Sequence, residues 1–431
     1  MAKRHSLNPT DWESVFGRLE ELVMANSGED AFTEIFKLIM GKLTQESTGP
    51  QASLVGKTAP ESVENVNHWL AVAERQWPQI LNQDITTKLT EDQVHSCLLE
   101  LERISLHDTH LEVLDGLFEH LVSQTQKGSK GQFFTPRTVI EAVVQMVAPQ
   151  YGERVADPAC GSGGFLMHAH QFMMQATPEN ERTTPPAIYG YDLDPKTTRI
   201  SKAMSLFIGG DPKNIVRLNS LVTPSAGEAL FKINSNEDVM TIEDVERSRG
   251  NTDGCFDVII TNPPFAGEVT GESLLAPYDL ARNTKRNERD VLFIERCVRL
   301  LRPNGRLAIV VPSGRTGSKH NAFVRDWLMG HLRIVSVLSL DRNTFRPHTS
   351  QKADVIFGYR RPRRAKPEQY KDEEILFLTS EKSGKDSRGQ IVSAEENSGR
   401  PLWESSDHDL AEGIRLFKDF IKENKIEWGV K

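Results

Sequence analysis

The chain has 431 residues, of which 26% are charged and 38% hydrophobic, and its formal net charge is −8. This length predicts two or three domains with a sizeable core, and the acidic balance argues against a protein that wraps nucleic acid by itself. No apolar run reaches the roughly 18 residues that a membrane span needs, and the start of the chain lacks the apolar centre of a signal peptide. We therefore expect a cytoplasmic protein with no membrane partner.

The four cysteines are scattered along the chain and form no CxxC pair or Cys/His spacing. This usage predicts buried, reduced thiols rather than disulfides or a zinc site. We accordingly expect no metal. The cysteines are Cys97, Cys160, Cys255 and Cys297.

Residues 1–128 are predicted to form an all-helical N-terminal domain. Apolar residues recur there at three- and four-residue spacing, and Thr90 holds the position of an N-cap. A stretch rich in Gly, Lys and Ser, residues 125–134, marks the first boundary. The predicted helices cover residues 11–25, 29–45, 90–106 and 110–124.

Residues 129–364 alternate short buried strands with helices, which predicts an α/β domain. The pattern is typical of a Rossmann-like, seven-stranded and mostly parallel sheet with helices on both faces. Ligands of such sheets bind beyond the carboxyl ends of the strands. A polar insert, residues 223–254, is interpreted as a surface loop, and residues 365–431 as a short C-terminal extension with one helix. The predicted strands are residues 154–159, 187–194, 215–221, 256–261, 306–312, 333–340 and 353–361.

The first of these strands ends in DPACGSGGF, residues 157–165. Gly161, Gly163 and Gly164 would allow a tight turn into the next helix and a close approach of the backbone to a ligand. The spacing differs from the GxGxxG of dinucleotide enzymes and lacks the GK[ST] of a phosphate-binding loop. A ligand without a pyrophosphate is therefore favoured.

The second strand ends in YGYDLDP, residues 189–195. An acidic group at this point is placed to accept hydrogen bonds from both hydroxyls of a ribose. Asp192 is the candidate because it stands at the strand end. Asp194 begins the turn, and we expect it to cap the helix that follows.

The fourth strand leads into NPPF, residues 262–265. Proline fixes φ and restricts the residue before it, so Asn262 and the Pro263 carbonyl are held in one extended geometry. Two such acceptors could bind the hydrogens of an exocyclic amine and free its lone pair for attack, while Phe265 stacks on the ring. The alternative is a chain turn with a core phenylalanine. The presence of the glycine loop and Asp192 in the same chain makes this structural interpretation less favoured.

Taken together, DPACGSGGF, TNPPF and the upstream GQFFTP (131–136) resemble the motifs of S-adenosylmethionine-dependent DNA adenine-N6 methyltransferases. The likeness is greatest to the methylation subunit of type I restriction-modification systems. GRLAIVVPSG (305–314), FRPHTSQKADVIFGYRR (345–361) and EKSGKDSRG (381–389) are similar to downstream segments of that subunit, and the helical N-terminal part resembles its N-terminal domain.

The resemblance implies a role for each matching position. The catalytic residues would be Asn262, Pro263, Pro264 and Phe265. S-adenosyl-L-methionine would lie with its methionine part against the FFTP segment and its amino-acid end at the glycine loop. Its ribose would be held by the carboxylate of Asp192. The implied cofactor-binding residues are Phe133, Thr135, Pro136, Asp157, Cys160, Gly161, Gly163, Asp192 and Asn219. Asn219 stands where these enzymes often carry an Asp that accepts from the cofactor's adenine amine, and an amide oxygen can still accept.

The implied reaction is direct, in-line transfer of a methyl group from the sulfonium to adenine N6, leaving S-adenosyl-L-homocysteine. The adenine must be flipped out of the duplex, which costs a few kcal/mol of free energy. Stacking of the base on Phe265 would offset roughly 1–3 kcal/mol of this cost. A cytosine-C5 enzyme would need a Pro-Cys dipeptide, which the chain lacks. Candidates for contacts with DNA phosphates follow the NPPF loop. They are Arg282, Lys285, Arg286 and Arg289.

The residues beyond the last predicted strand are too few for a target-reading domain, so DNA reading is expected to belong to another subunit. The resemblance implies two methylation subunits with one DNA specificity subunit, at times with a restriction/translocase subunit. The N-terminal domain and the C-terminal extension would supply the partner and DNA contacts. Two alternatives stay open: a methyltransferase acting on an RNA base or a glutamine amide, and a cofactor-binding scaffold or sensor of a defence complex with little turnover.

Overall fold

Two compact units make up the chain, and each is described by itself. The first comprises Met1–Gly128 with Lys202–Pro212, and the second comprises Ser129–Ser201 with Lys213–Lys431. None of the described helices is long and apolar enough to cross a membrane. This computed structural model describes residues 5–6, 12–24, 31–49, 52–78, 80–81, 84–106, 116, 134–225, 240–250, 255–283, 287–393 and 402–429.

The described part of the first unit is mainly helical, but it is not all-helical as predicted, because two short strands, β1 and β2, pair in parallel. Thr90 is the N-cap of α4: its hydroxyl accepts from the backbone N–H of Gln93, while the Gln93 side chain accepts from the N–H of Thr90. Helix α3 was not predicted, and the predicted helix at 110–124 and nearly all of the boundary segment 125–134 lie outside the described residues. The elements are β1 His5–Ser6, α1 Trp12–Met24, α2 Ala31–Thr48, α3 Ala59–Gln76, α4 Glu91–Glu102 and β2 Ile104–Ser105.

Helix α2 is the buried centre of this unit, and the charges that it buries are paired. The Lys37 side chain is fully buried, and its Nζ lies 2.8 Å from Glu34 Oε1 and 2.9 Å from Asp84 Oδ2. Nζ also donates to the Thr86 carbonyl at 2.8 Å. Three acceptors satisfy the three donors of this ammonium, so its burial carries no unmet hydrogen bond.

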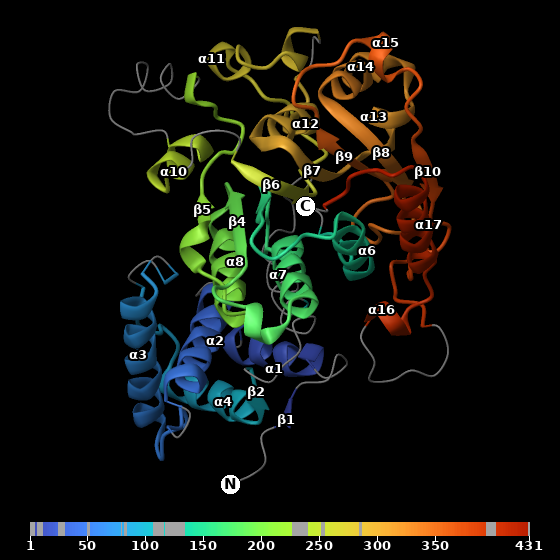
Figure 1. Ribbon diagram of the computed structural model, residues 1–431. Helices are drawn as coiled ribbons and strands as arrows, with labels where there is room; N and C mark the ends of the chain where they lie inside the picture. Colours follow the sequence, from blue (N-terminus) through green and yellow to red (C-terminus); the bar gives the residue numbers. More distant parts are fainter. Residues whose placement is uncertain are drawn as a thin grey trace. The chain divides into compact units, whose positions relative to one another are not determined.

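The second unit is built on an eight-stranded sheet with helices on both faces, so the predicted α/β class is confirmed (Figure 1). All seven predicted strands are present. The predicted number of strands is wrong by one, because residues 376–379 add an eighth strand at the edge. The strands are β3 Arg154–Asp157, β4 Ala187–Asp192, β5 Ile215–Arg217, β6 Phe256–Thr261, β7 Leu301–Pro312, β8 Leu332–Ser339, β9 Ala353–Arg360 and β10 Leu376–Thr379.

The strand order is β10-β8-β9-β7-β6-β3-β4-β5, and every strand but β9 runs in the same direction. The chain builds outward from β3 first through β4 and β5, and then returns to the other side of β3 as β6 and β7. The order therefore reverses between β3 and β6. A crevice opens at such a point beyond the carboxyl ends of the two strands, where open α/β sheets bind their ligands.

Helices α6, α7 and α17 lie along one face of the sheet, and α12 and α14 lie on the other (Figure 1). The core on the second side packs apolar side chains of α12 and α14 against β6 and β7. The α-helices are α6 Arg137–Val147, α7 Gly164–Ala176, α8 Pro195–Phe207, which begins in this unit, α10 Ile242–Ser248, α11 Glu272–Leu275, α12 Arg289–Leu300, α13 Ser313–Gly317, α14 Ala322–His331, α15 Pro367–Tyr370, α16 Leu402–Ser405 and α17 Leu410–Glu423.

The segment predicted as a separate C-terminal extension, residues 365–431, is part of the second unit. Its strand β10 pairs with β8 along the sheet edge. Helix α17 buries Ile414 and Phe417, and the Trp428 indole donates to the Met146 carbonyl of α6 at 2.7 Å. The predicted boundary at 364 is therefore wrong, because the apolar face of this segment is used within the chain.

The polar insert, residues 223–254, is only partly the surface loop that its composition predicts, because it contains helix α10. Glu246 of α10 has no exposed side-chain surface and accepts from the Tyr191 hydroxyl at 2.8 Å. Arg249 donates to the same carboxylate at 2.7 Å, and Arg154 also pairs with it. These charge pairs anchor the helix beside strand β4, and a local polar composition does not reveal them.

Candidate functional site

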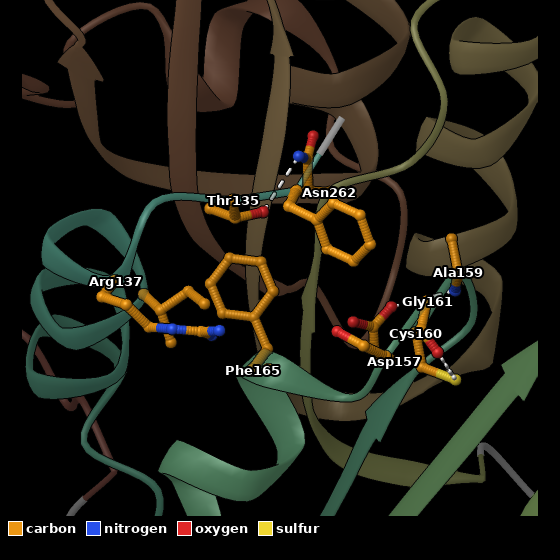
Figure 2. Close-up of a pocket in the computed structure, with 12 residues that line it drawn as sticks. Thr135, Arg137, Asp157, Ala159, Cys160, Gly161, Phe165 and Asn262 are labelled. Atoms are coloured by element: carbon orange, nitrogen blue, oxygen red, sulfur yellow. Dashed lines mark hydrogen bonds between the residues drawn. The ribbon is translucent and has the colours of Figure 1, made fainter. Parts of the chain in front are cut away.

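A pocket opens where the strand order reverses, between the carboxyl ends of β3 and β6 (Figure 2). The empty space between its walls measures about 400 Å³, open solvent included. The start of α6, the glycine loop with the start of α7, and the end of β6 supply its walls. The lining residues are Phe134, Thr135, Arg137, Ile140, Asp157, Ala159, Cys160, Gly161, Ser162, Gly164, Phe165 and Asn262.

Asp157, the last residue of β3, is the buried acid of the pocket. It is 2% exposed, and its Oδ1 accepts from the backbone N–H of Ala159 at 2.9 Å. Burial raises the pKa of this carboxyl to about 7, although the Thr261 hydroxyl and the Ala159 N–H oppose the rise. A cation that binds beside a carboxyl with such a pKa lowers the pKa and favours the ionised form.

The glycine loop makes the tight turn that its sequence predicts. Gly161 and Gly163 have φ of +53° and +94°, in the left-handed region that suits glycine. The backbone of Cys160 is fixed on both sides, since its N–H donates to the Tyr191 carbonyl at 3.0 Å and its carbonyl accepts from Gly163 at 2.8 Å. In Figure 2 this loop forms one wall of the pocket, next to Asp157.

Replacing Gly163 with alanine should destabilise the second unit and weaken binding in the pocket. A Cβ there would lie 2.6 Å from Ser201 Oγ and 2.9 Å from Met167 Cε, at a positive φ. Strain of this kind costs on the order of 1–3 kcal/mol. Thermal unfolding should show a lower midpoint for Gly163→Ala, whereas Gly152→Ala tests positive φ alone, because its Cβ would meet no atom within 4 Å. Equal midpoints for the two variants would contradict the steric account.

Asp192 is buried at the end of β4 and holds the glycine loop. Its Oδ2 accepts from the Gly161 N–H at 2.9 Å, and its Oδ1 accepts from the Asp194 N–H at 2.8 Å and the Thr197 hydroxyl at 3.2 Å. Burial raises the pKa of this carboxyl. Asp192 is not among the described residues that line the pocket. Its visible role is to position Gly161, and its predicted contact with a ribose stays a prediction.

Asp194 caps helix α8 as predicted, and its Oδ1 accepts from the backbone N–H groups of Lys196 and Thr197, both at 2.9 Å. Asn219 lies two residues beyond the end of β5, and its Oδ1 accepts from the N–H of Leu221 at 3.1 Å. The Asn219 side chain therefore shapes a turn, and it is not among the described lining residues. Its predicted contact with a ligand is untested.

Asn262 projects from the end of β6 into the pocket and meets Thr135 from the segment before α6 (Figure 2). Its Nδ2 donates to Thr135 Oγ1 at 3.0 Å. One hydrogen bond thus joins the two predicted motifs, between residues that lie 127 positions apart in the chain. Pro136 follows as the N-cap of α6. Phe133 lies outside the described residues.

Pro263 is buried and Pro264 half-buried, and the chain then turns to Phe265. The Phe265 ring meets the Phe345 ring edge to face, with centroids 5.9 Å apart. Phe345 comes from the loop between β8 and β9 and is 2% exposed. Phe265 is half-buried and is not among the described residues lining the pocket. Its contact with Phe345 holds the ring beside the pocket.

Sequence reasoning missed three aromatic or charged residues of this region. Phe165 projects its ring from α7 toward the Thr135–Asn262 pair, and Arg137 lies across from it (Figure 2). Phe165 is the last residue of the predicted DPACGSGGF motif and Arg137 directly follows GQFFTP, so their positions could have indicated both. Phe345 gave no such signal, because its contact with Phe265 depends on the order of strands in the sheet.

Of the four predicted phosphate-binding residues, the structure describes the side chain of one. Lys285 and Arg286 lie outside the described residues, and only the backbone of Arg282 is described, in a turn. Arg289 begins α12, and its N–H donates to the Gly267 carbonyl at 2.9 Å. A Cβ at Gly267 would lie 2.9 Å from Arg289 Nη2, so this guanidinium lies against the loop that follows NPPF.

A model of the N-6 DNA Methylase family matches residues 109–399, more than half of the chain. The methylase subunit of the type I restriction enzyme EcoEI from Escherichia coli is 28% identical over 271 residues, covering 62% of this chain and 49% of that protein. The StySPI methylase subunit from Salmonella potsdam is 25% identical over 320 residues, covering 71% and 56%. The chain thus spans about half the length of these two relatives.

A solved structure shows that the likeness extends to the fold. The type I restriction-modification methyltransferase subunit from Streptococcus thermophilus superposes with a TM-score of 0.60 at 15% identity. The match covers 98% of this chain and 99% of that one. Within the described ranges, His, Cys, Asp and Glu side chains do not gather in groups of three or more that could hold a metal ion.

Proposed function

The chain belongs to the N-6 DNA Methylase family, and we propose that it transfers a methyl group from S-adenosyl-L-methionine to N6 of a flipped adenine in duplex DNA. The observation that carries the proposal is the pairing of Asn262 with Thr135 in a pocket that also contains Asp157 and the glycine loop. An amide at a strand end, a buried acid and an open backbone turn together suit a cationic cofactor beside a target amine.

The residues of the pocket fit S-adenosyl-L-methionine. Asp157 is a buried carboxyl that an ammonium would hold in its ionised form, and Gly161 and Gly163 keep the loop free of side chains. Phe165 and Ile140 give the wall an apolar part. Bound there, the cofactor would supply an electrophilic methyl group on a sulfonium. Asp157, the glycine loop and Thr135 would hold it, with Pro136, Asp192 and Asn219 as the further predicted contacts.

Asn262 would act on the amine of the target adenine. Its Oδ1 and the Pro263 carbonyl would accept hydrogen bonds from the two N6 hydrogens, which withdraws the nitrogen lone pair from the ring. With Nδ2 donating to Thr135, the amide oxygen is the atom left to accept from the adenine amine. Phe265, held by Phe345, would stack on the flipped base, and such stacking is worth about 1–3 kcal/mol.

We further propose that the chain is the modification subunit of a type I-like restriction-modification or related defence complex and acts in the cytoplasm. The relatives named above are methylase subunits of type I enzymes. The formal charge of −8 also favours DNA reading by a separate specificity subunit, because a chain that binds DNA tightly alone is usually basic.

The proposal is tested by isolating the tagged chain with the subunits that accompany it and supplying methyl-tritiated cofactor. The substrates are unmodified host DNA, host RNA and protein, and nucleoside mass spectrometry identifies the product. N6-methyladenine in DNA is the expected result. Label in RNA or in a glutamine side chain would replace the proposed substrate, and cofactor binding without transfer to any of the three would favour a scaffold.

A further inference from the structure

Two loops meet at the carboxyl edge of the sheet beside Phe265. The first, residues 341–352, joins β8 to β9 and carries Phe345, whose ring contacts Phe265. The second, residues 381–390, follows β10. Because β8 and β10 run parallel, both loops leave the sheet at the same edge as the NPPF segment. The first loop thus lies against the predicted base-stacking ring.

The loops are packed together backbone to backbone. Gly389 has a φ of +85°, and a Cβ there would lie 2.6 Å from the carbonyl carbon of Arg346. Lys385 Nζ donates to the Arg346 carbonyl at 3.2 Å, and the Ser383 hydroxyl donates to Asp341 at 3.0 Å. We call residues 341–352 and 381–390 the two-loop platform, since these contacts make them one surface.

The two-loop platform is basic although the chain is acidic. It contains six Lys or Arg and three Asp or Glu, a net of +3 against −8 for the whole chain. The carboxylates of Asp341 and Asp386 each accept hydrogen bonds from backbone N–H groups of their own loops. Three of the cations, Arg342, Lys352 and Arg388, are exposed, and Arg388 also attracts the carboxylate of Asp386 in its own loop.

We propose that the two-loop platform binds phosphates of the DNA strand that carries the target adenine, on the side of Phe345. The inference rests on the proposed function. A flipped nucleotide leaves its two flanking phosphates beside the ring on which the base stacks, and fixed cations there hold the strand in its distorted form. Exposed guanidinium and ammonium groups suit phosphate oxygens, and each contact with a phosphate makes binding depend more steeply on salt.

The chain offers a matched control at the opposite edge of the sheet. Strand β9 runs antiparallel to its neighbours, so the basic stretch that follows it lies at the amino edge of the parallel strands. Arg363, Arg364 and Lys366 are exposed there. The variant Arg363→Gln/Arg364→Gln/Lys366→Gln removes the same charge as Arg342→Gln/Lys352→Gln/Arg388→Gln but leaves the two-loop platform intact.

The test uses the tagged chain isolated with its accompanying subunits. DNA affinity is measured by fluorescence anisotropy on a duplex of unmodified host sequence between about 50 and 200 mM salt, and methyl transfer is measured on the same DNA. The platform variant should bind at least about tenfold more weakly and show a shallower dependence of log affinity on log salt, by about 0.9 per lost phosphate contact. Its cofactor affinity and unfolding midpoint should equal those of the wild type, which shows that it is folded.

Each outcome decides the inference. Wild-type affinity and transfer in the folded platform variant, or equal losses in the platform and control variants, would overturn it. If the platform variant still binds DNA but no longer binds an acidic protein that the wild type and the control variant bind, the surface belongs to a protein partner instead. Absence of methyl transfer by the wild-type complex would contradict the proposed function itself. DNA affinity is measured separately, so it would still show whether the two-loop platform binds DNA.

Discussion

Replacing Asn262 with alanine should lower the rate of methyl transfer to DNA by about a hundred- to a thousandfold, the usual effect of removing one group that stabilises a developing charge. The affinity for the cofactor should change little. The variant removes the acceptor proposed for the adenine amine, while Asp157 and the glycine loop, which are proposed to hold the cofactor, keep their contacts. The measurement compares single-turnover transfer with cofactor affinity from calorimetry.

Two further variants separate the acceptor from its orientation. Asn262→Asp keeps an oxygen but loses the N–H donor to Thr135, and Thr135→Val keeps Asn262 but removes the partner. If the hydrogen bond orients the amide, Thr135→Val should lower the rate about tenfold, roughly the worth of one hydrogen bond. Full activity of Asn262→Ala, with cofactor bound, would disprove the role of the amide and leave the fold assignment intact.

The sequence predicts the centre of the second unit well because its strands are continuous apolar runs bounded by turn residues. The glycine loop, Asp157 and Asn262 each stand at the end of such a run, so a parallel sheet brings them to one edge. The same logic fails at β10, where Leu376–Thr379 is too short and too exposed to be recognised as a strand. Only pairing with β8 gives this segment its place.

Contacts between distant loops are the part of the site that sequence patterns do not reveal. Phe345 reaches Phe265 because β9 is inserted between β7 and β8, and no local periodicity reports that order. Asp192 illustrates a second limit. Its position at a strand end predicts a ligand contact, but its oxygens accept three hydrogen bonds from Gly161, Asp194 and Thr197. A carboxylate that organises a loop and one that binds a ribose have the same sequence signature.

Replacing Asp157 with asparagine should abolish cofactor binding and raise the unfolding midpoint by a few degrees at pH 8. The carboxyl is 2% exposed, and burial raises its pKa to about 7 from an ordinary value of 3.8. The folded chain therefore binds the proton more tightly than the unfolded chain, and the stability contributed by the protonated acid is lost as pH rises from about 4 to 7. An uncharged amide of the same shape avoids this loss and can still accept from Ala159.

The pH dependence distinguishes this account from a purely structural role of Asp157. The midpoint advantage of Asp157→Asn should shrink as pH falls from 7 and vanish below about pH 4, where the wild-type carboxyl is protonated in the folded and the unfolded chain alike. Cofactor affinity of the wild type should fall as pH drops from 8 to 6, because the ionised acid is the form that an ammonium group prefers. Calorimetric titrations at several pH values measure this, with Asn262→Ala as a variant that retains Asp157. A midpoint difference that stays constant across pH would show that the pKa of Asp157 is the same in the folded and the unfolded chain, so that hydrogen bonds from Thr261 and Ala159 already offset the cost of its burial.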